Sequence, residues 1–112
     1  MRHYRQEKIS SLIQKKLGWI LIKSVEVEGA IITITSVDVS RKLDYAFVKV
    51  SVLPGEKAEQ VIRILKKRKR EFQSMLLRET RLRFIPNIEF EFDRGAENAA
   101  RVEKALLDDI QK

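Results

Sequence analysis

The chain has 112 residues and a net charge of +7, and this length suits one domain with its own hydrophobic core. It contains no cysteine and one histidine, which excludes disulfides and the common zinc-binding sets. No apolar run is long enough to span a bilayer, and the charged N-terminus lacks the apolar stretch of a secretion signal. We therefore expect a soluble, cytoplasmic protein in which residues 1–112 form a single domain.

The chain is expected to begin with an amphipathic helix over residues 5–17. Its apolar residues follow helical spacing at Ile9, Leu12, Ile13 and Leu17. Gly18 is the expected stop, because glycine commonly follows the last turn of a helix. Residues 19–28 stay ambiguous, since their apolar residues fit either an extension of this helix or a short strand.

Two strands that pair as an antiparallel hairpin are expected next. Residues 30–39 are rich in isoleucine, threonine and valine, and their apolar positions shift from 32 and 34 to 37 and 39, as a bulge or a twist would require. Residues 45–53 alternate, with Ala46, Val48, Val50 and Val52 on one face. The connection over residues 40–44 is short enough for a hairpin.

The second half of the chain predicts helices around one further strand. Apolar residues follow helical spacing from Ala58 to Leu65, give way to the basic run Lys66–Arg70 and resume at Phe72, which indicates two helices or one kinked helix. Pro86 argues against a helix across residues 84–88, and residues 88–92 then alternate apolar and acidic, with the acidic face expected to meet water. A final helix is expected from about 96 to 110. The whole order predicts an α+β fold, a three-stranded sheet with helices packed on one face.

The positive charge is concentrated in the middle of the chain. Residues 63–83 hold nine basic and two acidic residues, whereas the other residues hold fourteen of each. A cationic segment on a neutral body indicates a polyanionic partner. The alternative is a solvated helix face, although five consecutive like charges over Lys66–Arg70 repel one another and weaken the helix that holds them.

No set of residues suggests catalysis or a cofactor. His3 lies near a terminus, where an incidental exposed role is expected, and there is no glycine-rich nucleotide loop or nucleophile elbow. The Glu89/Glu91 and Asp108/Asp109 pairs could hold Mg²⁺ or act as acid and base, but alternate glutamates on a strand usually only solvate it. We therefore expect no enzyme activity, no metal and no cofactor.

Two strings of the sequence resemble the ribosome-binding factor A family. They are Val37-Asp38-Val39-Ser40-Arg41, followed by Leu43, Ala46 and Val48, and Leu82-Arg83-Phe84-Ile85-Pro86-Asn87-Ile88-Glu89-Phe90, closing at Asp93. The resemblance covers roughly residues 5–107. It implies a type II KH-like fold and a non-catalytic factor that binds the immature 30S subunit, contacts 16S rRNA and assists late maturation, with a role in growth in the cold.

Two positions depart from the family pattern. The family has an alanine-any-glycine motif at the kink between its two central helices, but Arg68-Lys69-Arg70 stands there and no Gly-x-x-Gly occurs anywhere. The kink must therefore form without glycine, or the helix must run straighter. Lys42 stands where the family usually has an acidic residue after Ser-Arg, and Asp44 could take its place.

The candidate RNA-binding surface is the basic run together with the basic residues expected near it. Its members are Arg41, Lys42, Lys66, Lys67, Arg68, Lys69, Arg70, Arg78, Arg81 and Arg83. Arginine offers a planar fork for phosphate and lysine a point charge. The expected partner is 16S rRNA on the free 30S subunit, bound by a monomer. The alternatives are a general nucleic-acid binder and a protein-interaction module that recognises an acidic partner.

Aromatic stacking on RNA is the weaker prediction. Tyr45, Phe47 and Phe84 could offer ring faces to bases, but a place in the core is the favoured interpretation of each, because single-strand platforms usually expose several aromatics on one sheet face. Trp19 is expected either in the core or on the flank of the first helix.

Overall fold

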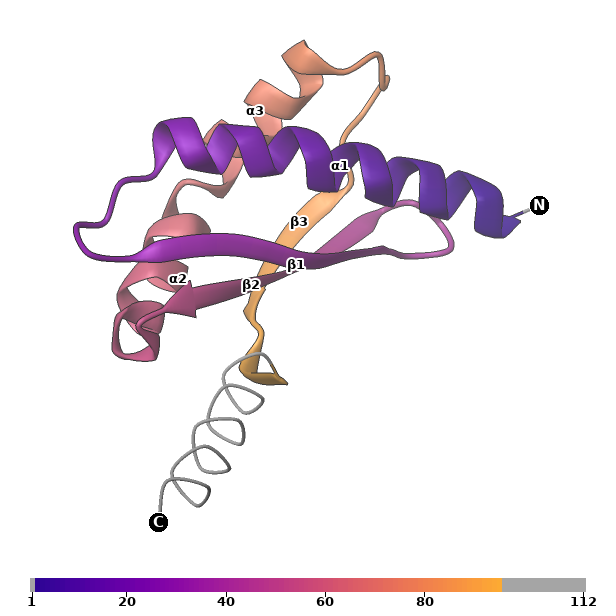
Figure 1. The fold of residues 1–112 in the computed structure, drawn as a ribbon. Coiled ribbons are helices and arrows are strands. Elements are labelled where there is room, and N and C mark those ends of the chain that lie inside the picture. Colours follow the sequence, from indigo (N-terminus) through magenta and orange to yellow (C-terminus); the bar gives the residue numbers. More distant parts are fainter. Residues whose placement is uncertain (1, 96–112) are drawn as a thin grey trace.

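The computed structural model describes residues 2–95 and forms a three-stranded sheet with helices on one face (Figure 1). In chain order the elements are α1 (Arg2–Ser24), β1 (Ile31–Val39), β2 (Tyr45–Leu53), the short 3-10 helix η1 (Gly55–Lys57), α2 (Ala58–Lys67), α3 (Lys69–Glu79) and β3 (Asn87–Phe92). The central strand β2 pairs antiparallel with β1 and parallel with β3. The predicted α+β order is confirmed, and the helix predicted over 96–110 lies outside the described residues.

Helix α1 is longer than the sequence predicted. It continues through Gly18 to Ser24, so the expected stop at Gly18 is wrong and the ambiguous segment after it begins as helix. Ile20 and Leu21 are buried beyond the glycine, and their burial outweighs the roughly 1 kcal/mol that glycine costs a helix. No helix within residues 2–95 combines the length and hydrophobicity that a transmembrane span requires.

The turn between α1 and β1 requires a glycine. Gly29 has φ +76°, in the left-handed region that side chains disfavour. The ammonium of Lys57 lies beside it and donates a hydrogen bond to the carbonyl oxygen of Glu28. The turn is therefore closed partly by a side chain from η1, which follows β2 at the same end of the hairpin.

The hairpin contains the irregularity that the phase shift predicted. Its register changes between Ile34, which faces Val50, and Ser36, which faces Lys49, leaving Thr35 as the extra residue of a β-bulge. The Thr35 hydroxyl donates to Asp93 Oδ2 at 2.6 Å. After the bulge the odd positions of β1 face the helices, so that both halves of the strand turn their apolar residues inward.

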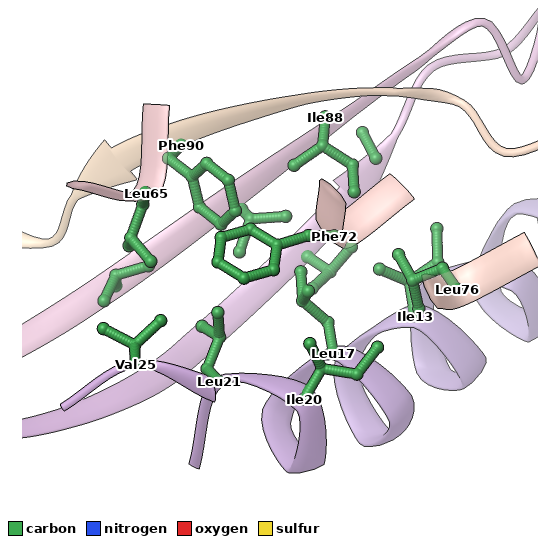
Figure 2. Close-up of a cluster of buried hydrophobic side chains, with 14 of the residues drawn as sticks. Ile13, Leu17, Ile20, Leu21, Val25, Leu65, Phe72, Leu76, Ile88 and Phe90 are labelled. Atoms are coloured by element: carbon green, nitrogen blue, oxygen red, sulfur yellow. The ribbon is translucent and has the colours of Figure 1, made fainter. Parts of the chain in front are cut away.

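The core lies between the sheet and the helices and is centred on Phe72 (Figure 2). Phe72 of α3 is fully buried and meets Phe90 of β3 edge to face, with ring centroids 6.1 Å apart. Ile13 and Leu17 of α1 are fully buried in the same cluster. Every element except η1, which has no buried residue, thus contributes to one hydrophobic cluster.

Replacing Gly18 with alanine should stabilise the protein. A Cβ at Gly18 would meet no atom within 4 Å, and the residue is helical, so the change only removes backbone freedom from the unfolded chain. We expect the free energy of unfolding in urea to rise by about 0.5–1 kcal/mol.

Gly29→Ala is the matched control for this substitution. It should lower the same free energy by more than about 1 kcal/mol, because its φ is positive and the new Cβ would lie 3.1 Å from Lys57 Nζ. Destabilisation by Gly18→Ala would contradict the open space around that residue.

Candidate nucleic-acid interface

Arg68 alone separates α2 from α3, which settles how the junction forms without glycine. Its φ of −98° and ψ of 13° are accessible to any side chain. Its backbone N–H donates to the Ile64 carbonyl at 3.0 Å, and its own carbonyl accepts from Phe72 N–H at 3.1 Å. Arg68 therefore closes the last turn of α2 and opens the first turn of α3, and the two-helix alternative is the observed one.

The side chain of Arg68 is committed to the fold. Its Nε and Nη2 donate to the two carboxylate oxygens of Glu71 at 2.8 and 3.0 Å, and Nη1 donates to the Ser24 carbonyl at 2.6 Å. The guanidinium also lies 5.0 Å from the centroid of Phe72. One cation thus caps the C-terminus of α1, where a positive charge is favoured, and ties it to the start of α3.

We call the contacts of Arg68 with Glu71 and Ser24 the clasp. Its two opposite charges shift each other's pKa. The side-chain hydrogen bond from Arg68 lowers the pKa of Glu71, and the same bond raises the pKa of Arg68. Lys69 is also engaged, with its Nζ 3.5 Å from Glu89 Oε1. Of the five residues in the basic run, Lys66, Lys67 and Arg70 are exposed and make no ion pair within the described part of the chain.

The other predicted cations do not all lie beside the run. Arg41 and Lys42 border a surface hollow together with Arg5, and Arg5 borders a second hollow together with Arg81 and Arg83. We call this group the hairpin end, defined by Arg5, Arg41, Lys42, Arg81 and Arg83. Arg5 was not among the predicted site residues, and its place in an ordinary helical pattern gave no signal of its role.

The hairpin end and the basic run lie at opposite ends of α1 (Figure 1). Arg68 binds Ser24 at one end, and Arg5 is nineteen residues earlier in the same helix. At 1.5 Å per residue the two positions are roughly 28 Å apart. Arg78 lies in a groove with Ile20 and Lys23, between α1 and α3. The predicted single patch is therefore two basic surfaces.

The hairpin turn is held by hydrogen bonds between Ser40 and the residues Asp44 and Tyr45. The Ser40 hydroxyl donates to Asp44 Oδ1 at 2.6 Å and accepts from the Tyr45 N–H at 3.0 Å. Asp44 therefore supplies the carboxylate of this turn, and Lys42 is left exposed. Both turn cations are free of ion pairs within residues 2–95.

The core interpretation of the aromatic residues is wrong. Tyr45, Phe47 and Phe84 are 43%, 38% and 58% exposed, because the odd positions of β2 point away from the helices and Phe84 lies in the loop before β3. Tyr45 and Phe47 stack on the open face of the sheet, with ring centroids 6.2 Å apart. Trp19 is on the flank of α1 and 56% exposed.

One of the two acidic residues of β3 is engaged within the fold. Glu89 is half-buried, since it accepts from Lys69 and from the Asn87 side chain at 3.1 Å, so only part of the acidic face meets water as predicted. Within residues 2–95, no three carboxylate or histidine side chains gather around one point. Asp108 and Asp109 lie outside the described residues.

Comparison with known proteins gives a consistent result. Residues 5–106 match the family model for ribosome-binding factor A. The ribosome-binding factor A of Chlorobium phaeobacteroides is 38% identical over 96% of the chain and 95% of that protein. The factor of Coprothermobacter proteolyticus is 34% identical over the whole chain and 82% of that protein.

Solved structures show the same fold. The crystal structure of ribosome-binding factor A from Thermus thermophilus superposes with a TM-score of 0.68 at 23% identity, over 78% of this chain and 93% of that one. The solution NMR structure of a Thermotoga maritima protein, provisionally assigned as a ribosome binding factor A, gives 0.65 at 28% identity, over 79% and 86%. A homology model of the Thermus thermophilus factor was fitted into a cryo-EM map of a 30S complex of that factor. It matches this chain with a TM-score of 0.65 at 24% identity, over 76% of this chain and 91% of that one.

Arg68→Ala should destabilise the fold, whereas Lys67→Ala at the preceding position should not. The change removes the charged hydrogen bond to Ser24 and the pair with Glu71, and we expect the free energy of unfolding in urea to fall by about 1–2 kcal/mol. Lys67→Ala, which removes an exposed and unpaired cation, should change it by less than about 0.5 kcal/mol. Equal losses in the two variants would contradict a structural role for Arg68.

The clasp should also make stability depend on pH. Because the pKa of Glu71 is lowered in the folded state, its stabilisation is present above the ordinary value of 4.5 and is lost as pH falls through the folded value. The wild-type protein should therefore be more stable than Glu71→Gln near pH 7, and this difference should shrink below about pH 4.5. Glu26→Gln, in the loop after α1, is the control, and an equal pH dependence in both variants would contradict the assignment.

Proposed function

The chain belongs to the ribosome-binding factor A family, and from this membership and its free cations we propose that it binds 16S rRNA on the immature 30S subunit and assists late assembly without catalysis. The family's name describes binding to the ribosome, and the Thermus thermophilus factor was fitted into a 30S complex. A ribosomal partner makes the cytoplasm the place of action. The observation that carries the proposal is that Lys66, Lys67, Arg70 and the cations of the hairpin end make no ion pair within residues 2–95, whereas Arg68 is bound to Glu71 and Ser24.

Two surfaces would grip the RNA in different places. Lys66, Lys67 and Arg70 project from the α2–α3 junction, and the hairpin end lies roughly 28 Å away along α1. Phosphates repeat along an RNA strand, so two separated cationic surfaces suit a folded RNA with strands on both sides of the protein. Close backbone approach, which a glycine loop would allow, is replaced here by contacts from long side chains.

Binding alone can promote maturation. A protein that binds one rRNA conformation better than another raises the population of the first by its differential affinity. No bond needs to be made or broken. The protein then leaves when the mature conformation no longer presents the same phosphates.

Reversing the free charges at the junction should weaken binding to 30S particles. In Lys67→Glu/Arg70→Glu the net charge falls from +7 to +3, and we expect co-sedimentation with free 30S subunits to be lost at about 150 mM salt. At lower salt, the slope of log affinity against log salt should fall by about two. Arg68 is kept, because its side chain holds the junction together.

Lys15→Glu/Arg94→Glu is the matched control. It makes the same change in net charge at exposed residues outside both basic surfaces, and it should retain most of the binding. Equal loss in the two variants would reduce the effect to total charge. If the wild type binds unrelated duplex RNA as tightly as 30S particles, the protein is a general nucleic-acid binder. If the affinity of the wild type for 30S particles does not change with salt concentration, the partner is a protein.

A further inference from the structure

We propose that the hairpin end binds one unpaired nucleotide of an RNA strand, with the base on Phe84 and the adjoining phosphates on the surrounding cations. This inference rests on the proposed function and names a subsite of it. Two hollows meet there. One of about 260 Å³ has Phe84, Leu43 and Pro86 in its wall, and the other, of about 460 Å³, is bounded by Arg5, Arg41, Lys42 and Leu43.

Phe84 supplies a flat apolar surface at the right place. It is 58% exposed in the loop between α3 and β3, whereas its neighbour Pro86 is buried and Ile85 packs against the core. The loop is therefore anchored immediately after the exposed ring. Every nucleobase has a π-face, so such a ring can stack on any unpaired base. A hollow just below the roughly 300–1,000 Å³ of drug-sized pockets suits one small flat group.

The charges around the two hollows suit a phosphate strand. Arg5, Arg41, Lys42, Arg81 and Arg83 line them, and none of the lining residues is acidic. None of the five makes an ion pair with a residue in the range 2–95. Arginine can pair bidentately with a phosphate that flanks a stacked base. A ring set among unpaired cations is the arrangement used for single-stranded nucleic acid, and an acidic peptide would leave the ring face unused.

The other exposed aromatics lack this setting. Phe47 of the Tyr45–Phe47 stack lies between Asp38 of β1 and Glu89 of β3, its partners in the two neighbouring strands. Carboxylates on both sides repel a phosphate chain. Trp19 lies beside Lys23, whose Nζ is 5.7 Å from the ring centroid, but neither Trp19 nor the exposed Tyr4 lines either hollow. Phe84 is therefore the aromatic side chain best placed for RNA among the described residues.

The site is formed by the first turns of α1, the hairpin turn and the loop before β3, and hydrogen bonds hold these three segments together without a ligand. Gln6 Nε2 of α1 donates to the Val39 carbonyl at 2.9 Å, which fixes the helix on the end of β1. Asn87 N–H donates to the Asp44 carbonyl at 2.8 Å, which fixes the loop before β3 on the hairpin turn. Leu43, common to both hollows, has φ +61°, a conformation that a leucine adopts only when its surroundings impose it. A preformed site needs little ordering when it binds.

The experiment uses the full chain and purified free 30S subunits. Affinity is measured for the wild type, Phe84→Leu and Phe84→Tyr, and ultraviolet cross-linking with mass spectrometry identifies which residue joins to which nucleotide. Trp19→Leu is the matched control, because it also removes an exposed aromatic from a surface position. Circular dichroism melts should be the same for all four proteins, since both positions are exposed.

Phe84→Leu should bind 30S subunits about 5- to 150-fold more weakly, the usual effect of losing one stacked base. Its salt dependence should be unchanged, because the cations remain. Phe84→Tyr and Trp19→Leu should bind like the wild type, and the wild type should cross-link at Phe84 to a nucleotide that is unpaired in the 30S particle.

Wild-type affinity in Phe84→Leu, with cross-links confined to the α2–α3 junction, would overturn the nucleotide site and leave the proposed function standing. Failure of the wild type to bind 30S subunits at all would overturn both. A cross-link from Phe84 to a ribosomal protein, with none to RNA, would also overturn the site and point to a protein partner for the hairpin end.

Discussion

The burial of one face of the sheet beneath the helices determines where everything else lies. A three-stranded sheet has one apolar face here, formed by the even positions of β2 and by Ile88 and Phe90 of β3. Helix α1 must run across that face to cover it, and its 23 residues give it a length of about 34 Å. The two basic surfaces are attached to the two ends of this helix, so its length sets their separation.

Arg68 shows how a charged residue can take over a structural task. At the position where the family resemblance led us to expect a small residue, this chain has an arginine whose backbone needs no special conformation. Its side chain bonds Glu71 and Ser24 and lies over Phe72, so the C-terminus of α1 and the start of α3 are joined by one group. Arg68, one of the predicted RNA-binding residues, is therefore engaged within the scaffold.

The difference between free and engaged cations matters more than their number. Arg68 and Lys69 already have carboxylate partners, and a phosphate would have to compete with them. The cations of the hairpin end have no such partners among the described residues, and they surround a hollow with an exposed ring. Electrostatic attraction from both surfaces can bring RNA to the protein. Of the two surfaces, the hairpin end is the one with an exposed aromatic ring, Phe84, on which an unpaired base could stack.

The sequence by itself determined the strands, the helical stripes and the position of the cationic segment. Periods of two and 3.6 residues report which side chains face a core, so the hairpin, its bulge and the strand after Pro86 could be predicted from local patterns. The same patterns placed a break or a kink at the basic run, and the structure has a break there. The resemblance of residues 37–48 and 82–93 to one family then gave the fold.

Only the tertiary structure decided the extent of α1, the role of Arg68 and the membership of the hairpin end. Gly18 is a helix breaker in isolation, and burial of Ile20 and Leu21 overrides it. Arg5 and Arg83 are 78 positions apart in the chain, and no local pattern relates them. They line one hollow because β2 pairs in parallel with β3, which carries the loop before β3 to the hairpin turn, where the first turns of α1 also lie. Long-range strand pairing is a property of the whole core, and this is why a list of basic residues could not show which of them form one surface.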